Sequence, residues 1–259
     1  MKILVCIKQV ICSEIPLAVR PDGKWLQEDD HTEFRMNRFD DYALEEALRI
    51  KETRPDVSID VLSVGPDRVK DVIKKGLSKG ADNGVHVFSP EQGYLAPQSV
   101  ARLIADWAGS RSYDLILTGV MAEDDMQCQV GPMTAALLAL PCAVSVIKEK
   151  LDPEQGCMTV HCEMENGKVE VAEIILPAVL TIQSGINRPR YPSLSNIMRA
   201  NKQDLIVADG SLSGTKPDTT ELIALAYPEK SSKIKLIDGT AEEKAGQLLD
   251  IFYTKSLLR

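Results

Sequence analysis

The stretch that decides the fold is KILVCIK, Lys2–Lys8, in which five apolar residues stand in a row between two lysines. A continuous apolar run of this length is typical of a β-strand that is buried on both faces. Such a strand occurs in parallel sheets that are covered by helices on both sides. The first residues of the chain therefore predict an α/β fold.

The chain up to about residue 139 alternates between strand and helix patterns, as this fold requires. Strand patterns follow at Val57–Val64, Val85–Phe88 and Asp114–Thr118. Helix patterns lie near Asp40–Lys51, from Gly65-Pro66 to about Ser78, at Ala96–Trp107 and from about Pro132 to Ala139. Residues 18–27 predict a short hairpin around Pro21-Asp22-Gly23. This order predicts a mostly parallel sheet with right-handed crossovers.

After Cys142 the pattern changes to strands without helices. Four strand patterns follow, at Cys142–Lys148, Met158–Glu163, Val169–Ile175 and Ala178–Ile182, with a turn at residues 165–167. We expect them to form an antiparallel extension of the sheet.

The chain from residue 187 onward differs again. A basic segment is followed by a stretch rich in Gly, Ser, Thr and Pro at 209–219 and by an amphipathic helix over roughly Thr240–Ser256. One isolated amphipathic helix is hard to bury on its own domain, which predicts an extended C-terminal arm packed on a partner. The alternative is that the arm folds back on the sheet. The expected division is a nucleotide-binding α/β domain at 1–186 and the arm at 187–259.

The charge distribution narrows the choice of partners. The net charge of −8 argues against nucleic acid or an anionic membrane as the main partner. Residues 187–203 nevertheless carry +4 and no acid, so the rest of the chain carries −12. A basic strip on an acidic protein indicates a docking surface, although charge alone fits a solvated loop equally well.

Several function classes find no support in the sequence. There is no G-x-G-x-x-G, no P-loop and no nucleophile elbow, so no catalytic residue is predicted. The six cysteines form no C-x-x-C pair and the three histidines are scattered, so no metal site is predicted. No run approaches the ~20 apolar residues that a membrane span needs. We expect a cytoplasmic protein without membrane insertion.

The loops that follow the predicted strands suggest a ligand site. In open α/β sheets ligands bind at the carboxyl ends of the strands, here near Cys6–Val10, Asn37–Asp40 and Gly119–Ala135. Gly131-Pro132 opens a helix, and its free N–H groups favour a phosphate. Gln129 and Thr134 add donors, while Glu123-Asp124-Asp125 can accept hydrogen bonds from ribose hydroxyls. The alternative is an ordinary capped helix after a solvated acidic loop.

A family resemblance extends this interpretation. The segment Arg188-Pro189-Arg190-Tyr191-Pro192-Ser193-Leu194-Ser195-Asn196-Ile197-Met198-Arg199-Ala200 strongly resembles the recognition loop of electron transfer flavoprotein β subunits. Further matches in the same order lie at residues 4–10, 37–48, 63–66, 79–82, 129–133 and 176–181. The resemblance fades beyond about residue 205.

The resemblance implies a Rossmann-like fold of the adenine nucleotide α-hydrolase kind and a heterodimer with an α subunit that holds most of the FAD. It implies AMP in the β subunit, or a second FAD in electron-bifurcating members. By position, the residues implied to bind the nucleotide are Cys6, Asn37, Arg38, Phe39, Asp40, Val64, Asp124, Asp125, Met126, Gln127, Cys128, Gln129, Val130, Gly131, Pro132, Met133, Thr134 and Ala135. The residues implied to dock partners are Arg190, Tyr191, Leu194, Ile197 and Met198, with Leu194 as the anchor.

The implied function is electron transport in fatty acid oxidation, by a carrier that takes electrons from acyl-CoA dehydrogenases and passes them to a quinone oxidoreductase. The chain departs from the family at Asp124–Cys128, where bifurcating members read Asp-Gly-Asp-Thr-Ala, and Cys162 replaces a basic residue. Since the Asp-Thr pair is absent, AMP is the favoured ligand. The alternatives are a bifurcating subunit with NADH as donor and a stand-alone adenine-nucleotide-binding protein.

Overall fold

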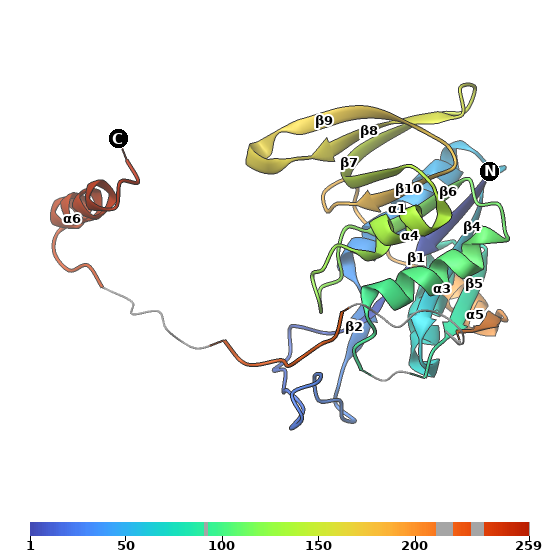
Figure 1. Ribbon diagram of the computed structural model, residues 1–259, viewed down its shortest axis with the longest axis horizontal. Coiled ribbons are helices and arrows are strands. Elements are labelled where there is room, and N and C mark those ends of the chain that lie inside the picture. Colours follow the sequence, from blue (N-terminus) through green and yellow to red (C-terminus); the bar gives the residue numbers. More distant parts are fainter. Residues whose placement is uncertain (91–92, 211–219, 229–235, 259) are drawn as a thin grey trace. The chain divides into compact units, whose positions relative to one another are not determined.

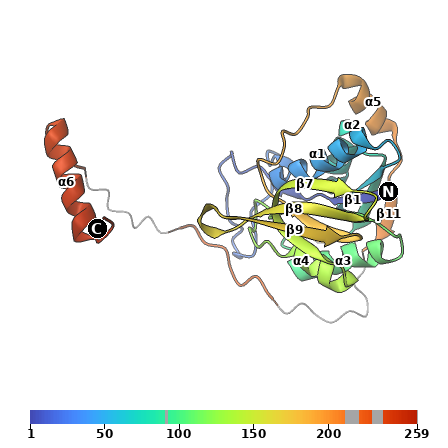
Figure 2. The same ribbon diagram turned by 90° about the horizontal axis from the view of Figure 1, so that it is seen from above.

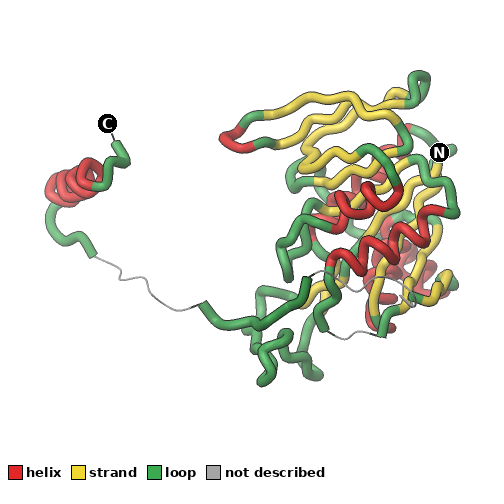
Figure 3. Tube along the Cα trace, in the orientation of Figure 1, coloured by secondary structure: helices red, strands yellow, loops and turns green. Residues whose placement is uncertain are grey.

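The computed structural model describes residues 1–90, 93–210, 220–228 and 236–258 (Figure 1). The chain forms two compact units, Met1–Leu225 and Ala226–Arg259. The first unit holds a nine-stranded sheet in the order β11-β5-β4-β1-β6-β10-β7-β8-β9, with helices, red in Figure 3, on both of its faces. No helix in the described part of the chain is long and apolar enough to cross a lipid bilayer.

The strands of the large sheet are β1 (Lys2–Cys6), β4 (Ser58–Gly65), β5 (Asn83–Phe88), β6 (Leu115–Gly119), β7 (Cys142–Asp152), β8 (Cys157–Glu163), β9 (Val169–Ile175), β10 (Ala178–Ile182) and β11 (Ile206–Asp209). A separate antiparallel pair is formed by β2 (Gln9–Ile11) and β3 (Phe34–Met36). The helices of the first unit are α1 (Arg38–Thr53), η1 (Asp67–Val69), α2 (Lys70–Lys79), α3 (Pro97–Gly109), α4 (Val130–Leu138), η2 (Glu165–Gly167) and α5 (Leu194–Lys202). These elements confirm the predicted α/β class.

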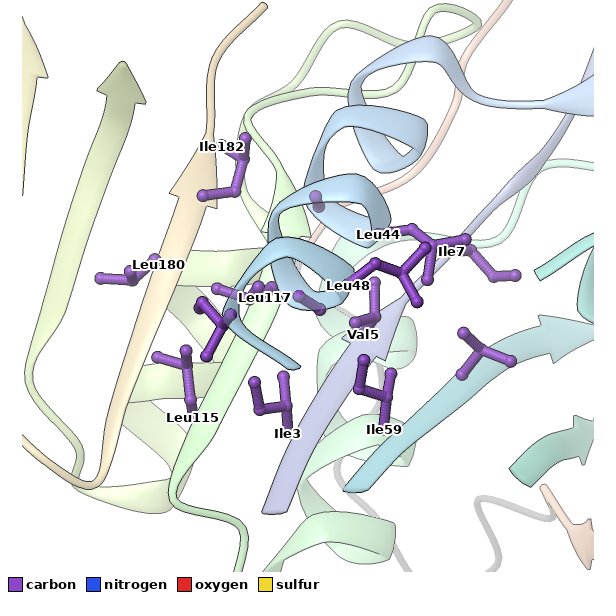
Figure 4. Close-up of a cluster of buried hydrophobic side chains, with 14 of the residues drawn as sticks. Ile3, Val5, Ile7, Leu44, Leu48, Ile59, Leu115, Leu117, Leu180 and Ile182 are labelled. Atoms are coloured by element: carbon purple, nitrogen blue, oxygen red, sulfur yellow. The ribbon is translucent and has the colours of Figure 1, made fainter. Parts of the chain in front are cut away.

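The apolar run of β1 is buried as predicted, because alternate residues face two different helical layers. Ile3 and Val5 pack in a cluster with α1 and α2, in which Leu44 is fully buried (Figure 4). Leu4 packs in a second cluster, with residues of α3 and α4. These two helices lie on the face of the sheet opposite α1 and α2 (Figure 2). Each such side chain contributes roughly 1.5–3 kcal/mol by leaving water, so a polar substitution in β1 would destabilise the layer that the replaced side chain faces.

The predicted antiparallel extension is confirmed for β7, β8 and β9, but not for Ala178–Ile182. That segment, β10, lies between β6 and β7 and pairs in parallel with both. All five of its residues are buried, as expected of a strand in the interior of a parallel sheet. The sequence AVLTI, which is apolar except for Thr181, already indicates such a strand. The assignment of this segment to the antiparallel extension was therefore wrong.

The segment after residue 187 contains elements that the sequence pattern did not predict. Helix α5 packs on α2, with Ala200 fully buried, and β11 pairs in parallel with β5. The structure therefore divides the chain at Leu225, later than the predicted boundary at residue 186. Packing of the arm on a partner subunit stays a prediction. Most of the Gly/Ser/Thr/Pro-rich stretch lies outside the described residues.

The second unit contains the predicted amphipathic helix, α6 (Ala241–Thr254). The Oγ1 of Thr240 accepts from the backbone N–H of Glu243, and the Glu243 side chain accepts from the N–H of Thr240. This reciprocal capping box explains why the helix begins there. Leu248, Leu249 and Tyr253 are exposed.

Candidate functional site

A cavity lies at the carboxyl ends of β1, β4 and β6, where the sequence analysis placed the ligand site. Its described lining residues come from the loops after these strands, from β2 and β3, from the starts of α1 and α4, from α3 and the residues before it, and from Trp25. The predicted site residues among them are Cys6, Asn37, Asp40, Val64, Asp124, Asp125, Gln127, Cys128, Gln129, Val130 and Gly131. The predicted residues that are not among the lining residues are Arg38, Phe39, Met126, Pro132, Met133, Thr134 and Ala135.

Two buried side chains at the start of α1 hold the loops that shape this cavity. Asp40 Oδ2 accepts from the backbone N–H of Lys8 (2.7 Å), and its Oδ1 accepts from that of Gly119 (2.9 Å). Asn37 Nδ2 donates to the carbonyl oxygen of Met121 (2.8 Å). Asp40 therefore joins the loop after β1 to the end of β6, and Asn37 fixes the acidic loop beyond it.

Burial raises the pKa of Asp40 to about 7, although hydrogen bonds from the backbone of Lys8, from Asn37 and from the backbone of Gly119 work in the opposite direction. A carboxyl group with this pKa carries a full charge only at alkaline pH. Its contacts are with the protein's own backbone, which makes it a positioning residue of the cavity wall.

The acidic loop that was expected to meet ribose hydroxyls forms an ion pair with a lysine. Lys8 Nζ lies 2.7 Å from Asp124 Oδ1 and 3.0 Å from Asp125 Oδ2. Burial raises the pKa of Asp124, and the charge of Lys8 works against that rise. Asp125 Oδ1 accepts from the backbone N–H of Gln127 (3.1 Å), so both oxygens of that carboxylate already have partners within the chain.

The start of α4 has the close packing that a bound nucleotide needs. A Cβ on Gly131 would lie 2.5 Å from Thr181 Cγ2 and 2.8 Å from Thr118 Oγ1, so only glycine fits there. The helix begins at Val130, two residues before the predicted Pro132. Thr134 Oγ1 is buried without a hydrogen-bond partner among the described residues. Free N–H groups in this first turn favour an anion.

Four aromatic or charged lining residues were not predicted from the sequence, namely Trp25, Phe34, Arg68 and Tyr94, whereas Gln9 lies in the predicted loop Cys6–Val10. The Trp25 and Tyr94 rings lie 5.6 Å apart, and the guanidinium of Arg68 lies 4.2 Å from the centre of the Phe34 ring. Gly65-Pro66, at the end of a predicted strand, was the available signal for Arg68. Trp25 belongs to the predicted hairpin, which the bridge between Val19 and Leu26 confirms.

The basic segment after residue 187 is held on α1 by buried acids. Arg190 Nη2 lies 2.8 Å from Glu45 Oε1, its backbone N–H donates to Glu45 Oε2 (3.0 Å), and its Nη1 donates to Glu52 (2.6 Å). Asn187 Nδ2 donates to Glu46 Oε2 (2.8 Å). The hydrogen bonds that Arg190 donates to Glu45 raise the pKa of Arg190 above its ordinary value. Arg190 was predicted to dock a partner, but in the structure it forms ion pairs with Glu45 and Glu52 of the same chain.

The other four predicted docking residues form an apolar surface patch. Tyr191 is 96% exposed and Leu194 is 73% exposed, and Ile197 and Met198 are also exposed. All four lie on α5 or just before it. Four large apolar side chains gathered at one exposed place are typical of a protein-binding surface.

Comparison with known proteins identifies relatives over nearly the whole chain. The family described as "Electron transfer flavoprotein domain" matches residues 25–212. The chain is 35% identical to "Electron transfer flavoprotein subunit beta" of Methylophilus methylotrophus over 259 residues, 97% of each chain. It is 32% identical to the protein of that name from Bos taurus over 255 residues, 97% of this chain and 98% of the relative. The mitochondrial relative from Arabidopsis thaliana is 38% identical over 205 residues, 79% of this chain and 80% of the relative.

Proposed function

This chain belongs to the electron transfer flavoprotein β-subunit family, and on that premise we propose that it works as the β subunit of an electron-carrying heterodimer in the cytoplasm. The α subunit holds most of the FAD, which accepts and releases the electrons. Acyl-CoA dehydrogenases supply these electrons and a quinone oxidoreductase receives them. The six cysteines are all free thiols, which suits a reducing compartment.

The observation that carries the proposal is the cavity at the strand ends. It combines a helix start where only glycine fits with an arginine on the opposite wall. These groups fit the phosphate and ribose of an adenine nucleotide. The chain's own work is to bind this nucleotide and to dock partners, and we assign it no bond-breaking step. AMP is the ligand we propose for this cavity.

The α subunit needs a surface, and the edge of the antiparallel extension offers one. Strand β9 lies at the end of the sheet and exposes Val169, Val171 and Ile175. An unpaired edge strand with exposed apolar side chains is prone to pair with another chain. Helix α6 exposes apolar side chains within its own unit as well. We therefore propose that both surfaces contact the α subunit.

Release of the bound ligands tests this function. The chain is co-expressed with its α subunit, the complex is purified and denatured, and the released nucleotides are counted. We expect a yellow heterodimer that yields one FAD and one AMP. Two FAD per heterodimer would instead support a bifurcating flavoprotein. A stable, flavin-free monomer that ignores the α subunit would favour a stand-alone nucleotide-binding protein and contradict the proposal.

Leu194 provides a prediction for the docking surface. Because Leu194 is 73% exposed in isolation, its burial against a dehydrogenase would contribute roughly 1.5–3 kcal/mol to the complex. Leu194→Ala should therefore lower the efficiency of electron uptake from the dehydrogenase by about 10-fold or more, with unchanged flavin content. The matched control is Leu137→Ala, an exposed leucine on α4. Equal kinetics for wild type and Leu194→Ala would remove this residue from the docking surface.

A further inference from the structure

The described residues that line the cavity include two cations, Lys8 and Arg68. The two differ in how closely carboxylates approach them. Lys8 lies within 3.0 Å of two carboxylates, so its charge is already neutralised. Among the described residues, the ion pair of Arg68 is a long one, 3.7 Å from Glu28 Oε1. Arg68 is therefore the lining cation whose charge remains available to a ligand.

The position of Arg68 is fixed before any ligand binds. Its Nη1 donates to Gln9 Oε1 (2.6 Å), and Gln9 Nε2 donates back to the carbonyl oxygen of Arg68 (2.9 Å). Its guanidinium stacks over the ring of Phe34. Its Nε is buried and has no hydrogen-bond partner among the described residues. A buried N–H donor without an acceptor is costly, so an acceptor from outside the chain would stabilise it.

The surroundings of Arg68 also leave its charge incompletely compensated. Burial lowers the pKa of Arg68, and the carboxylates of Glu28 and Asp124 offset this effect only in part. An anion bound in the cavity would stabilise the positive charge of Arg68, which these two carboxylates stabilise only in part. A guanidinium presents parallel N–H donors that match the oxygens of a phosphate group.

The topology places Arg68 across the cavity from α4. Arg68 follows β4, whereas α4 follows β6, and both strands flank β1. Strands β4 and β6 are therefore about 10 Å apart at the cavity floor. A phosphate that lies over the end of β1, between these strands, faces the N-terminus of α4 on one side and the long Arg68 side chain on the other, so that both can bind it.

From these contacts we propose that Arg68 binds the phosphate of the adenine nucleotide in this cavity, so that the cavity selects nucleotides over nucleosides. The inference rests on the function proposed above and adds the residue that reads the phosphate. Neither the sequence motifs nor the residues implied by the family resemblance include Arg68.

Comparison of AMP with adenosine tests this inference, because adenosine lacks only the phosphate. The heterodimer is stripped of nucleotide, and the Kd of each compound is measured by calorimetry for wild type and for Arg68→Gln. We expect Arg68→Gln to weaken AMP binding by roughly 10- to 100-fold, as for the loss of charge-assisted hydrogen bonds, and to leave adenosine binding unchanged. Arg68→Lys should lie between the two, because it keeps the charge and loses the planar fork.

The matched control is Arg54→Gln, which removes an arginine of similar exposure that pairs with Asp56 outside the cavity. Equal weakening of AMP and adenosine by Arg68→Gln would show that Arg68 only supports the wall, and unchanged AMP binding would likewise overturn the inference. A wild-type heterodimer that binds neither compound would contradict the proposed function itself. The three results are therefore distinguishable.

Discussion

Replacement of Asp40 by alanine is expected to lower the free energy of unfolding of this chain by about 2–4 kcal/mol at pH 8. The substitution removes the acceptor of two backbone N–H groups, those of Lys8 and Gly119, and leaves both without a partner. It also breaks the connection between the loops after β1 and β6. The cavity should lose its shape, so the purified heterodimer should contain less nucleotide.

Urea unfolding and ligand release measure these two effects, with Asp56→Ala as the control. Asp56 is an exposed acid whose nearest cation is Arg54, 3.2 Å away, so its loss should leave the urea midpoint close to that of wild type. If Asp40→Ala and Asp56→Ala unfold at the same urea concentration, Asp40 does not hold the two loops together.

The pH dependence of this effect follows from the raised pKa of Asp40. Burial lifts this pKa from 3.8 to about 7 in the folded chain. Between about pH 4 and pH 7 the folded chain therefore keeps a proton that the unfolded chain has lost, so the stability contributed by Asp40 falls as the pH rises through this window. The difference between wild type and Asp40→Ala should be larger at pH 5.5 than at pH 8. A difference that grows toward alkaline pH would contradict the raised pKa.

Much of the fold could be predicted from local sequence patterns, because burial on two faces leaves a plain signal. Lys2–Lys8 shows this best: its apolar run requires covering layers on both sides, and the structure has them. The same rule identifies β10 as an interior strand. The placement of Ala178–Ile182 among the antiparallel strands gave more weight to its neighbours along the chain than to its own composition.

The cavity was predictable on one side and not on the other. Strand ends and a Gly-Pro helix start are local features, and the loop that they indicated contributes Asp124 and Gly131 to the cavity lining. Trp25 reaches the cavity through packing with Tyr94, from a segment far away in the sequence. Such contacts depend on how a long loop folds over the sheet, which periodicity does not report.

The charge of the basic segment likewise did not predict which of its residues are available to a partner. Residues 187–203 carry +4, and this charge first suggested docking through cations. In the structure Arg190 is paired with Glu45, 145 residues away, whereas Tyr191 and Leu194 are exposed. The arginine positions the segment, and the apolar side chains form the surface that a partner meets.

Because the arginine positions the segment, we expect Arg190→Gln to weaken docking even though it leaves the exposed apolar side chains unchanged. Burial works to raise the pKa of Glu45, but hydrogen bonds from Arg190 outweigh it, so the pKa lies below its ordinary value. Loss of Arg190 leaves the carboxylate of Glu45, which is only 7% exposed, without this partner. Breaking such a pair is costly, and because Arg190 itself is partly exposed we expect about 2–3 kcal/mol. Residues 187–193 should loosen, seen as faster backbone hydrogen exchange, and electron uptake from the dehydrogenase should fall.

The double variant Arg190→Gln/Glu45→Gln separates the pair from its surroundings. Because two neutral amides can bond to each other and leave no unpaired buried charge, the double variant should be more stable than Arg190→Gln alone. Arg188→Gln is the matched control, since Arg188 is an exposed neighbour in the same loop. If Arg190→Gln and Arg188→Gln take up electrons equally well, and the double variant recovers nothing, the Arg190–Glu45 pair does not position the docking segment. If only Arg190→Gln is slow and the second substitution partly restores it, the exposed patch around Leu194 acts only when α1 holds it in place.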